Sequence, residues 1–519
     1  MMRMAGLVGA LLCAVPLAAQ DSVAVRDTVL PGVEAPRYGR LPTMTLPSSS
    51  SPPLPIDHWA ARAAARAHEL GLAPDYFPAQ RSVRRAEVAA ALEDAVQLAA
   101  LNAPELEPLA ASWVARFLEE FPEHVGERSI LLGGRAGVRV EDTYGLLEPA
   151  YGLFTARREP FRRRDRTELA ATATVAAAFG PFAAVAEPVA GGDGARVPLW
   201  DVSAAAGPVS VAFGRQPVGY GPVRGGAIVM SGSVPLVRAQ LQTDRGVTLP
   251  SFLRYLGPVT FHTAVTRLEE PRHPGRPWFW TAHGGLRPHP RFDVGITRAS
   301  VFGGDSIETP TTLENVGRMA LGLLTGEFEN QEVALDLRWR LPTERALPAT
   351  AYMEWGAEDA SGSWWRVPGR TFGLLLPALT PAIAAGAEYT SFAAPCCGNP
   401  PWYLHSAQRG GFVYRGEPLG HPLGGEGSEA MAYAEADLLD ARLRLEARAF
   451  TRDRGDEGLS QPQIAGNVYA PLRVGRSVGG GVDAAFRVTP RLEGRASLLT
   501  DVGDGWREHR VRVDVSYLF

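Results

Sequence analysis

The sequence contains no lysine. All 52 basic residues are therefore arginine, and because arginine is so common here, its presence at a position is weak evidence for a binding site. The 519-residue chain has a net charge of only -4. Nothing in this balance suggests a nucleic-acid partner, which would favour a strongly basic surface.

Cysteine is scarce as well. Cys13 lies in the N-terminal apolar run, which leaves the adjacent pair Cys396 and Cys397. Adjacent cysteines close only a small strained ring, so no disulfide framework holds the chain together. The best neighbouring ligand, His405, lies outside the tight spacing of zinc sites. We expect no metal or cofactor, and a structural or incidental role for the pair.

Long hydrophobic runs are absent beyond residue 20. A membrane-spanning helix needs about 20 consecutive apolar residues, so helical spans are excluded by sequence. A closed β-barrel is not excluded, because its lipid-facing residues alternate with lumen-facing ones and dilute the hydropathy.

Two segments precede the folded part. In residues 1–20, Arg3 comes before the apolar run Leu7 to Val15, and small residues follow. This pattern predicts a secretory signal peptide that is cleaved near its end. Residues 21–56 are rich in proline and serine and are predicted to form a flexible leader.

Residues 57–122 show helical spacing and are predicted to form a small α-helical periplasmic domain. His58 to Ala60, Leu70 to Leu72 and Ser82 to Val88 resemble a single S-layer-homology repeat. Such repeats usually act in sets, so we expect a helical cap on the next domain and keep peptidoglycan attachment as an alternative.

Residues 128–519 consist of short alternating runs, most clearly at the chain end. One strand face would carry the apolar or aromatic residues Val511, Val513, Val515, Tyr517 and Phe519, and the other Arg510, Arg512, Asp514 and Ser516. A strand of this kind that ends in phenylalanine resembles the closing strand and assembly signal of outer-membrane β-barrels.

Connections between the runs alternate in length. Short turns contain Gly180-Pro181, Gly207-Pro208 and Gly257-Pro258. Long glycine-rich or charged connections are predicted near residues 188–199, 216–248, 269–277, 303–315, 392–411 and 452–478. Outer-membrane barrels place short turns in the periplasm and long loops outside, so we predict an all-β transmembrane barrel of about 16–18 antiparallel strands. A soluble propeller or sandwich would explain neither this alternation nor the terminal Phe519.

Two segments carry the most unusual motifs. Residues 215–235 read RQPVGYGPVRGGAIVMSGSVP, and residues 403–424 read YLHSAQRGGFVYRGEPLGHPLG. Their order and position resemble the capsule-assembly (Wzi-like) outer-membrane family. The chain departs from the family pattern at Tyr220, where tryptophan is frequent, and at Ser233 and Val234, where an Asn-Ala pair is frequent.

This resemblance implies a monomeric barrel in the outer membrane of a Gram-negative-type bacterium. Its partners would be outer-membrane lipid and a capsular or other surface polysaccharide, which it would bind like a lectin without performing chemistry. Sugars pack on aromatic faces, and arginine offers a bidentate fork to acidic glycans. The candidate polysaccharide-binding residues are Arg215, Tyr220, Arg224, Trp402, Tyr403, His405 and His421.

Three other functions stay open. A porin or substrate-specific channel would use the same barrel, and a tether between outer membrane and peptidoglycan would use the helical domain. Catalysis has less support, because no serine nucleophile elbow, two-histidine zinc motif or paired-carboxylate spacing is present. We predict no catalytic residues.

Overall fold

The computed structural model describes residues 51–55, 58–79, 83–121, 130–144, 166–192, 194–232, 234–268, 272–323, 328–344, 346–358, 363–393, 401–414, 417–460 and 472–519. The predicted signal peptide, the leader up to residue 50, and Ser233, Cys396 and Cys397 lie outside the described residues.

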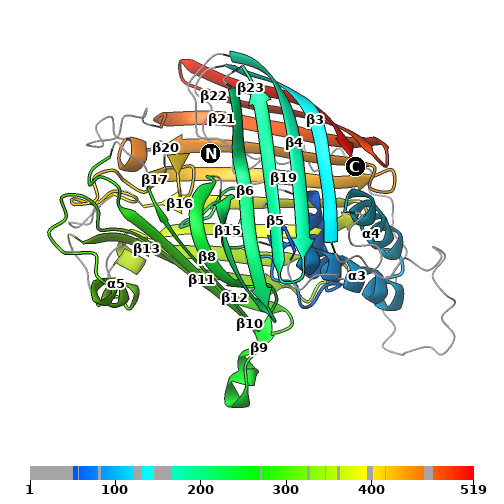
Figure 1. The fold of residues 1–519 in the computed structure, drawn as a ribbon, viewed down its shortest axis with the longest axis horizontal. Helices are drawn as coiled ribbons and strands as arrows, with labels where there is room; N and C mark the ends of the chain where they lie inside the picture. The colour runs from blue at the N-terminus through cyan, green and yellow to red at the C-terminus, as the bar shows by residue number, and fades with distance from the viewer. Residues whose placement is uncertain are drawn as a thin grey trace.

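Within these ranges, 18 antiparallel strands close into a barrel, which confirms the predicted fold class (Figure 1). The strands are β3 (Ile130–Tyr144), β4 (Arg166–Phe179), β5 (Phe182–Gly191), β6 (Gly194–Ala206), β7 (Val209–Gln216), β8 (Leu236–Thr243), β10 (Pro258–Arg267), β11 (Trp278–His289), β12 (Phe292–Phe302), β13 (Glu329–Arg340), β14 (Thr350–Glu358), β15 (Gly369–Thr380), β16 (Ile383–Phe392), β19 (Gly427–Leu438), β20 (Leu443–Arg454), β21 (Gly475–Thr489), β22 (Leu492–Gly503) and β23 (Trp506–Leu518). The two-residue β9 (Val247–Thr248) pairs with β10.

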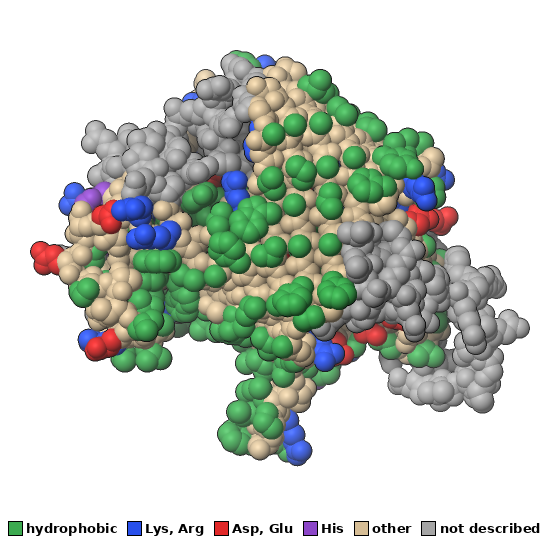
Figure 2. Space-filling view, in the orientation of Figure 1, with side chains coloured by type: hydrophobic (Ala, Val, Ile, Leu, Met, Phe, Trp, Pro, Cys, Tyr) green, Lys and Arg blue, Asp and Glu red, His purple; other side chains and the backbone are tan. Residues whose placement is uncertain are grey.

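The last strand closes the barrel on the first. Residues of β23 pair antiparallel with β3, and the Phe519 amide donates to the Gly134 carbonyl at 3.0 Å. Val511 and Val513 are exposed, whereas Arg510 is buried. The predicted apolar exterior and charged interior of this strand are therefore confirmed. Figure 2 shows apolar side chains in rows across the visible wall.

Two predicted long connections are wrong. Residues 188–199 form a hairpin, because β5 continues to Gly191 and β6 begins at Gly194. A register shift between Glu187 and Val189 accommodates the intervening proline. The predicted connection 216–248 contains the whole of β8. Glycine and proline were thus read as loop signals at places where the strands continue.

The helices α2 (Trp59–Glu69), α3 (Arg85–Asn102) and α4 (Glu107–Glu120) pack around Leu92, Trp113 and Phe117, which are fully buried. In the part of the chain that the structure describes, no helix is long and apolar enough to cross a membrane. The two-residue strands β1 (Pro53–Leu54) and β2 (Val83–Arg84), which flank α2 in sequence, pair antiparallel. The remaining small elements are η2 (Ser251–Leu256), α5 (Leu313–Ala320), α6 (Ser363–Arg366), β17 (Val413–Tyr414), β18 (Glu417–Pro418) and η3 (Gly458–Ser460).

The three helices lie at the barrel end that carries the short turns and the chain terminus (Figure 1). Arg66 on α2 donates to the carbonyls of Pro377 and Pro381 near the β15–β16 turn, at 2.7 and 2.9 Å. Arg116 on α4 reaches the Ala441 carbonyl in the β19–β20 turn at 2.7 Å. Because short turns face the periplasm in outer-membrane barrels, we call this end periplasmic and the opposite end outer.

Candidate functional site

The two motif segments fold into the lumen and pack on one another. We call residues 217–232, 234–235, 401–414 and 417–424 the lumenal plug. Ile228 and Met230 share one buried cluster with Phe412 and with the inward-facing wall residues Phe279 and Phe392. Segments that are about 170 residues apart in sequence therefore form one apolar body inside the barrel.

Hydrogen bonds fix the two segments to each other. The Tyr403 hydroxyl donates to the Ile228 carbonyl at 2.5 Å and accepts from the His421 amide at 2.9 Å. The Ser231 amide donates to the Leu419 carbonyl at 3.0 Å. Gly226 lies at a close approach of the two segments, where its φ is +143° and a Cβ atom would lie 2.7 Å from a Pro422 carbon. Only glycine fits this contact without strain.

Carboxylates of the barrel wall hold the plug backbone. Glu388 on β16 accepts from the amides of Arg224 and Gly225 at 2.5 and 2.7 Å. On β14, Glu354 accepts from the Ile228 amide at 2.8 Å, and Glu358 accepts from the Tyr403 amide at 3.1 Å. A buried segment without regular secondary structure needs acceptors for its N–H groups. Here charged side chains supply them, and such hydrogen bonds are stronger than neutral ones.

Tyr220 anchors the plug to a different part of the wall, on β10 and β11. Its hydroxyl hydrogen-bonds with His262 Nδ1 at 2.6 Å and with Thr281 Oγ1 at 2.9 Å. Its ring stacks on His283, with centroids 5.1 Å apart and planes at 8°. Burial raises the pKa of the Tyr220 phenol, so this group is neutral and acts as a hydrogen-bonding anchor.

Six of the seven candidate residues belong to the plug, and four of them form its interior. Tyr220, Trp402, Tyr403 and His421 are all no more than 1% exposed. The Trp402 indole donates to the Val367 carbonyl at 2.8 Å. These aromatic side chains therefore form the interior of the plug, where their faces are covered by protein.

Arg224 lies at the side of the plug toward the helices. Its guanidinium donates to Glu435 at 2.9 Å and lies 5.8 Å from the Tyr433 ring centroid. A small cavity of about 70 Å³ separates it from α2 and is lined in part by Arg62 and Glu69. Burial lowers the pKa of Arg224, but the nearby acidic groups, with Glu435 first among them, together outweigh burial and raise this pKa, which keeps the ion pair charged.

Arg215 and His405 lie apart from the buried group. Arg215 ends β7 with the same outward parity as the exposed Val211 and Phe213, and its Nε donates to the Pro235 carbonyl at 3.4 Å. His405 is half-buried, and its Nδ1 accepts from the Ala407 amide at 3.2 Å. The structure does not bring Arg215 into the lumen.

His421 is fully buried beside Phe392, with ring centroids 5.9 Å apart. Its Nδ1 accepts from the Leu423 amide at 3.1 Å. Among the described residues, its Nε2 has no hydrogen-bond partner. Burial lowers the pKa of His421 to about 4, so the imidazole is neutral at physiological pH and orders the local turn.

The sequence interpretation did not identify Glu354, Glu358 and Glu388 as functional residues. Glu354 and Glu358 share the inward parity of β14 and are nearly fully buried. The sequence did contain a signal for these two residues, because two carboxylates on the lumen face of one strand need hydrogen-bond or ion-pair partners inside the barrel.

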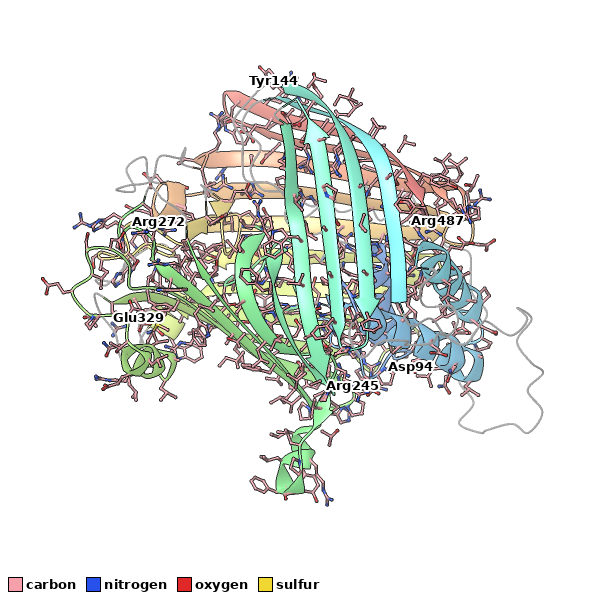
Figure 3. All side chains as sticks on the ribbon, in the orientation of Figure 1. Asp94, Tyr144, Arg245, Arg272, Glu329 and Arg487 are labelled. Atoms are coloured by element: carbon pink, nitrogen blue, oxygen red, sulfur yellow. The ribbon has the colours of Figure 1, made fainter. Side chains whose placement is uncertain are left out.

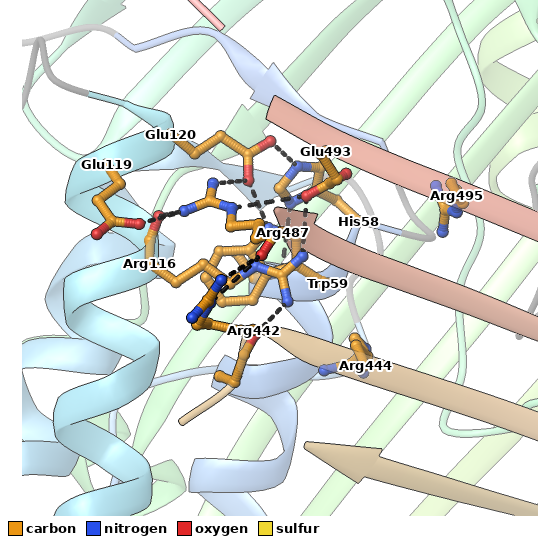
Figure 4. Close-up of polar contacts among 12 residues, drawn as sticks. His58, Trp59, Arg116, Glu119, Glu120, Arg442, Arg444, Arg487, Glu493 and Arg495 are labelled. Atoms are coloured by element: carbon orange, nitrogen blue, oxygen red, sulfur yellow. Dashed lines mark hydrogen bonds and ion pairs between the residues drawn. The ribbon is translucent and has the colours of Figure 1, made fainter. Parts of the chain in front are cut away.

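A polar cluster joins α4 to the periplasmic end (Figure 4). Arg116 donates to Glu493 on β22 at 3.1 Å, and Arg487 on β21 donates to Glu119 at 2.6 Å. Glu120 accepts from Arg135 on β3 at 2.5 Å and lies 3.2 Å from His58. Burial raises the pKa of Glu120, but the charges of Arg135, His58 and Arg487 outweigh it and hold this pKa well below its usual range.

Helix α2 extends this contact to the other side of the lumen. Arg62 pairs with Glu446, and Glu69 pairs with Arg338. His68 Nε2 lies 3.1 Å from Asp293. Charged side chains of the helices thus pair with inward-facing charges of β12, β13 and β20. We call residues 58–79 and 83–121, which contain these helices, the periplasmic cap.

A cavity of about 140 Å³ remains between the periplasmic cap and the wall around β3, β4 and β23. Its charged lining includes Arg139 and Arg512, which both donate to Asp514 at 2.7 Å. Among the described residues, no group of three or more His, Cys, Asp or Glu side chains could hold a metal ion. Within the described ranges, the plug and the periplasmic cap therefore both occupy the barrel interior, and a cavity with charged lining remains along one wall.

Comparisons with known proteins agree with this architecture. A family model described as capsule assembly protein Wzi matches residues 163–501. The solved structure of Wzi from Escherichia coli, an outer membrane protein involved in group 1 capsule assembly and described as a carbohydrate binding β-barrel, is 14% identical, with a TM-score of 0.68. The match covers 90% of this chain and 99% of that one.

Two Pseudomonas aeruginosa barrels are less similar. OprD is 11% identical over 76% of this chain and 94% of its own, with a TM-score of 0.43. OpdL is 12% identical over 75% of this chain and 98% of its own, also with a TM-score of 0.43. A search of curated protein sequences gives no significant match.

Proposed function

The chain belongs to the capsule assembly protein Wzi family, and from this membership we propose that it binds and retains capsular or other surface polysaccharide without catalysis. As a barrel of this family, it resides in the outer membrane. The E. coli protein of the same fold is described as carbohydrate binding. We extend that activity to this chain as a hypothesis.

The observation that carries the proposal is the lumenal plug. Its two segments are the motifs that resemble the family, and four of their backbone amides donate hydrogen bonds to the wall carboxylates of Glu354, Glu358 and Glu388. A transport protein needs a continuous aqueous path, whereas a binding protein needs a fixed platform. A lumen that is filled from both ends supports the binding role over the porin alternative.

The burial of the aromatic candidates supports an indirect role for them. Tyr220, Trp402, Tyr403 and His421 would shape the plug, and the glycan would contact side chains that remain accessible above it. His405 is half-buried and Arg409 is exposed on the same segment, where the Arg409 Nε donates to the Ser406 carbonyl at 3.0 Å. An arginine beside an imidazole suits an acidic sugar.

The test is deletion of the protein followed by measurement of cell-bound and shed polysaccharide. We expect the deleted strain to shed polysaccharide and wild-type protein to restore retention. A variant with His405→Ala and Arg409→Ala should assemble normally and restore retention only weakly, whereas Arg276→Ala, which changes an exposed arginine of another loop, should restore it fully.

Retention that is unchanged by deletion would contradict the proposal. Altered solute uptake, together with steady conductance of the purified protein in planar bilayers, would then favour the channel. The tether alternative needs a free surface on the helical domain, yet Trp59, Arg84 and Arg85 of the S-layer-like stretch are buried. Peptidoglycan pull-down that depends on residues 57–100 would support it.

A further inference from the structure

Two outer-end connections fold over the outside of the barrel, in contrast to the plug. Helix α5 packs through Met319, which is fully buried against Phe302 and Phe328. Phe302 ends β12, two residues beyond Ser300 and four beyond Arg298, so all three share one parity. This parity is also that of the exposed Ile296, and α5 therefore covers the outward face of the wall.

Arg298 ties the end of α5 to this face. Its guanidinium donates to the carbonyls of Met319 and Ala320, both at 2.8 Å. Arginine at a helix C-terminus satisfies the last carbonyls and complements the helix dipole. Beneath the same connection, Ser300 donates to Glu329 at 3.0 Å, and Gln331 donates to Glu329 at 3.1 Å. These outward polar groups are covered by α5 and its connection.

The wall becomes apolar immediately below this polar group. The next outward residue on β12 is Ile296, which pairs with Leu335, which in turn pairs with Trp355. One outward step along a strand is about 7 Å. The end of α5 thus lies about one step above the lipid-facing band, at the level where hydrocarbon gives way to headgroups.

The far side of these connections is apolar and uncovered. Leu313 is 93% exposed, Leu321 is 75% exposed and Leu323 is 65% exposed. Trp365 of α6 is 82% exposed, and its ring centroid lies 5.8 Å from that of Trp355. We call Leu313 to Leu323 and Trp365 the outer collar. Figure 2 shows apolar side chains over the wall and over the α5 region on the same visible face.

We propose that the outer collar is an interfacial membrane anchor that inserts Leu321, Leu323 and Trp365 into the outer leaflet of the outer membrane. The occupant is lipid because the collar is continuous with the lipid-facing surface through Ile296 and Trp355. Amphipathic helices lie in the interface with their apolar face in the acyl boundary, and tryptophan prefers that level. The exposed Arg318 of α5 would meet lipid phosphate.

This inference goes beyond polysaccharide binding and concerns a different surface. It implies that the barrel is held at a fixed depth and tilt at its outer end. An outer collar that lies at the headgroup level on one side of the barrel would keep the outer surface of the plug at the level of the cell surface.

The experiment places a fluorescent nitrobenzoxadiazole label on full-length protein in vesicles of lipopolysaccharide and phosphatidylethanolamine. Cys396 and Cys397 are changed to serine, and single cysteines are introduced by Leu321→Cys or Leu323→Cys. Ile296→Cys provides the lipid-facing control, and Arg409→Cys, at an exposed residue of the lumenal plug, provides the aqueous control. Heat-modifiable migration on gels verifies that each variant is a folded barrel.

We expect doxyl-labelled acyl chains to quench the label at residues 321 and 323 at least half as strongly as at residue 296. Iodide should quench these labels several-fold less than the label at residue 409. Iodide quenching equal to that at residue 409 would overturn the proposal. Protection from both quenchers, together with crosslinking between copies, would overturn it in favour of a second protein molecule.

Discussion

Removal of the Glu388 carboxylate should release the lumenal plug. Glu388 accepts from the amides of Arg224 and Gly225 at 2.5 and 2.7 Å and from the Tyr352 hydroxyl at 2.7 Å. Hydrogen bonds to charged groups contribute about 1.5–3 kcal/mol each. Glu388→Ala removes two such bonds to the plug, so plug docking should weaken by about 3–6 kcal/mol. The population of molecules with an undocked plug would then rise by a factor of roughly 10² to 10⁴.

Hydrogen exchange of the plug amides measures this change, because the periplasmic cap still fills the other end of the lumen in the variant. In Glu388→Ala, the Ile228 and Tyr403 amides, which donate to other wall carboxylates, should exchange roughly 10² to 10⁴ times faster than in the wild-type protein. Asp483→Ala is the matched control, because Asp483 is also a buried lumen carboxylate but pairs with Arg495 on the neighbouring strand at 2.9 Å. Folded Glu388→Ala protein whose plug amides exchange no faster than those of the Asp483→Ala control would refute the idea that wall carboxylates hold the plug.

Two predictions concern the periplasmic cap. Arg116→Met leaves the buried Glu493 with one partner fewer and removes the contact with Trp59 at 4.5 Å. The cap should therefore lose about 3–5 kcal/mol of docking energy and become sensitive to protease. In the control Arg276→Met, which breaks an exposed ion pair, protection from protease should change by less than about 1 kcal/mol. Because the pKa of Glu120 is held below its usual range, its stabilisation is present above about pH 4.3 and is lost as the pH falls through the folded value. Hydrogen exchange in α4 should therefore accelerate only in strong acid, and this acid response should disappear in Glu120→Gln.

The sequence was sufficient for the barrel because strand faces alternate with a period of two. The rows Val511, Val513, Val515 and Arg510, Arg512 predicted both faces of β23 correctly. Connection lengths were less reliable, since glycine and proline also occur inside strands where bulges form. The hairpin between β5 and β6 shows this limit, because its proline is absorbed by a register shift.

The motif segments were predictable as special, but their direction of folding was not. A loop can fold outward, as α5 does, or inward, as the plug does, and no local rule decides between these. One signal was available in residues 217–235, where Arg224 is the only charged residue. An apolar segment of that length is poorly suited to water, and its composition favoured burial. The wall carboxylates that accept hydrogen bonds from the amides of this segment lie more than 100 residues away in sequence.

The cluster around α4 links the folding of the cap to completion of the barrel. Glu120 bonds to the first strand, and Arg116 bonds to the strand next to the last. These partners come together only when β23 pairs with β3, so a barrel that has not closed would leave several charged side chains without ion-pair partners. Docking of the periplasmic cap therefore depends on closure of the barrel. In this chain, docking of the three helices would therefore indicate that the barrel has closed.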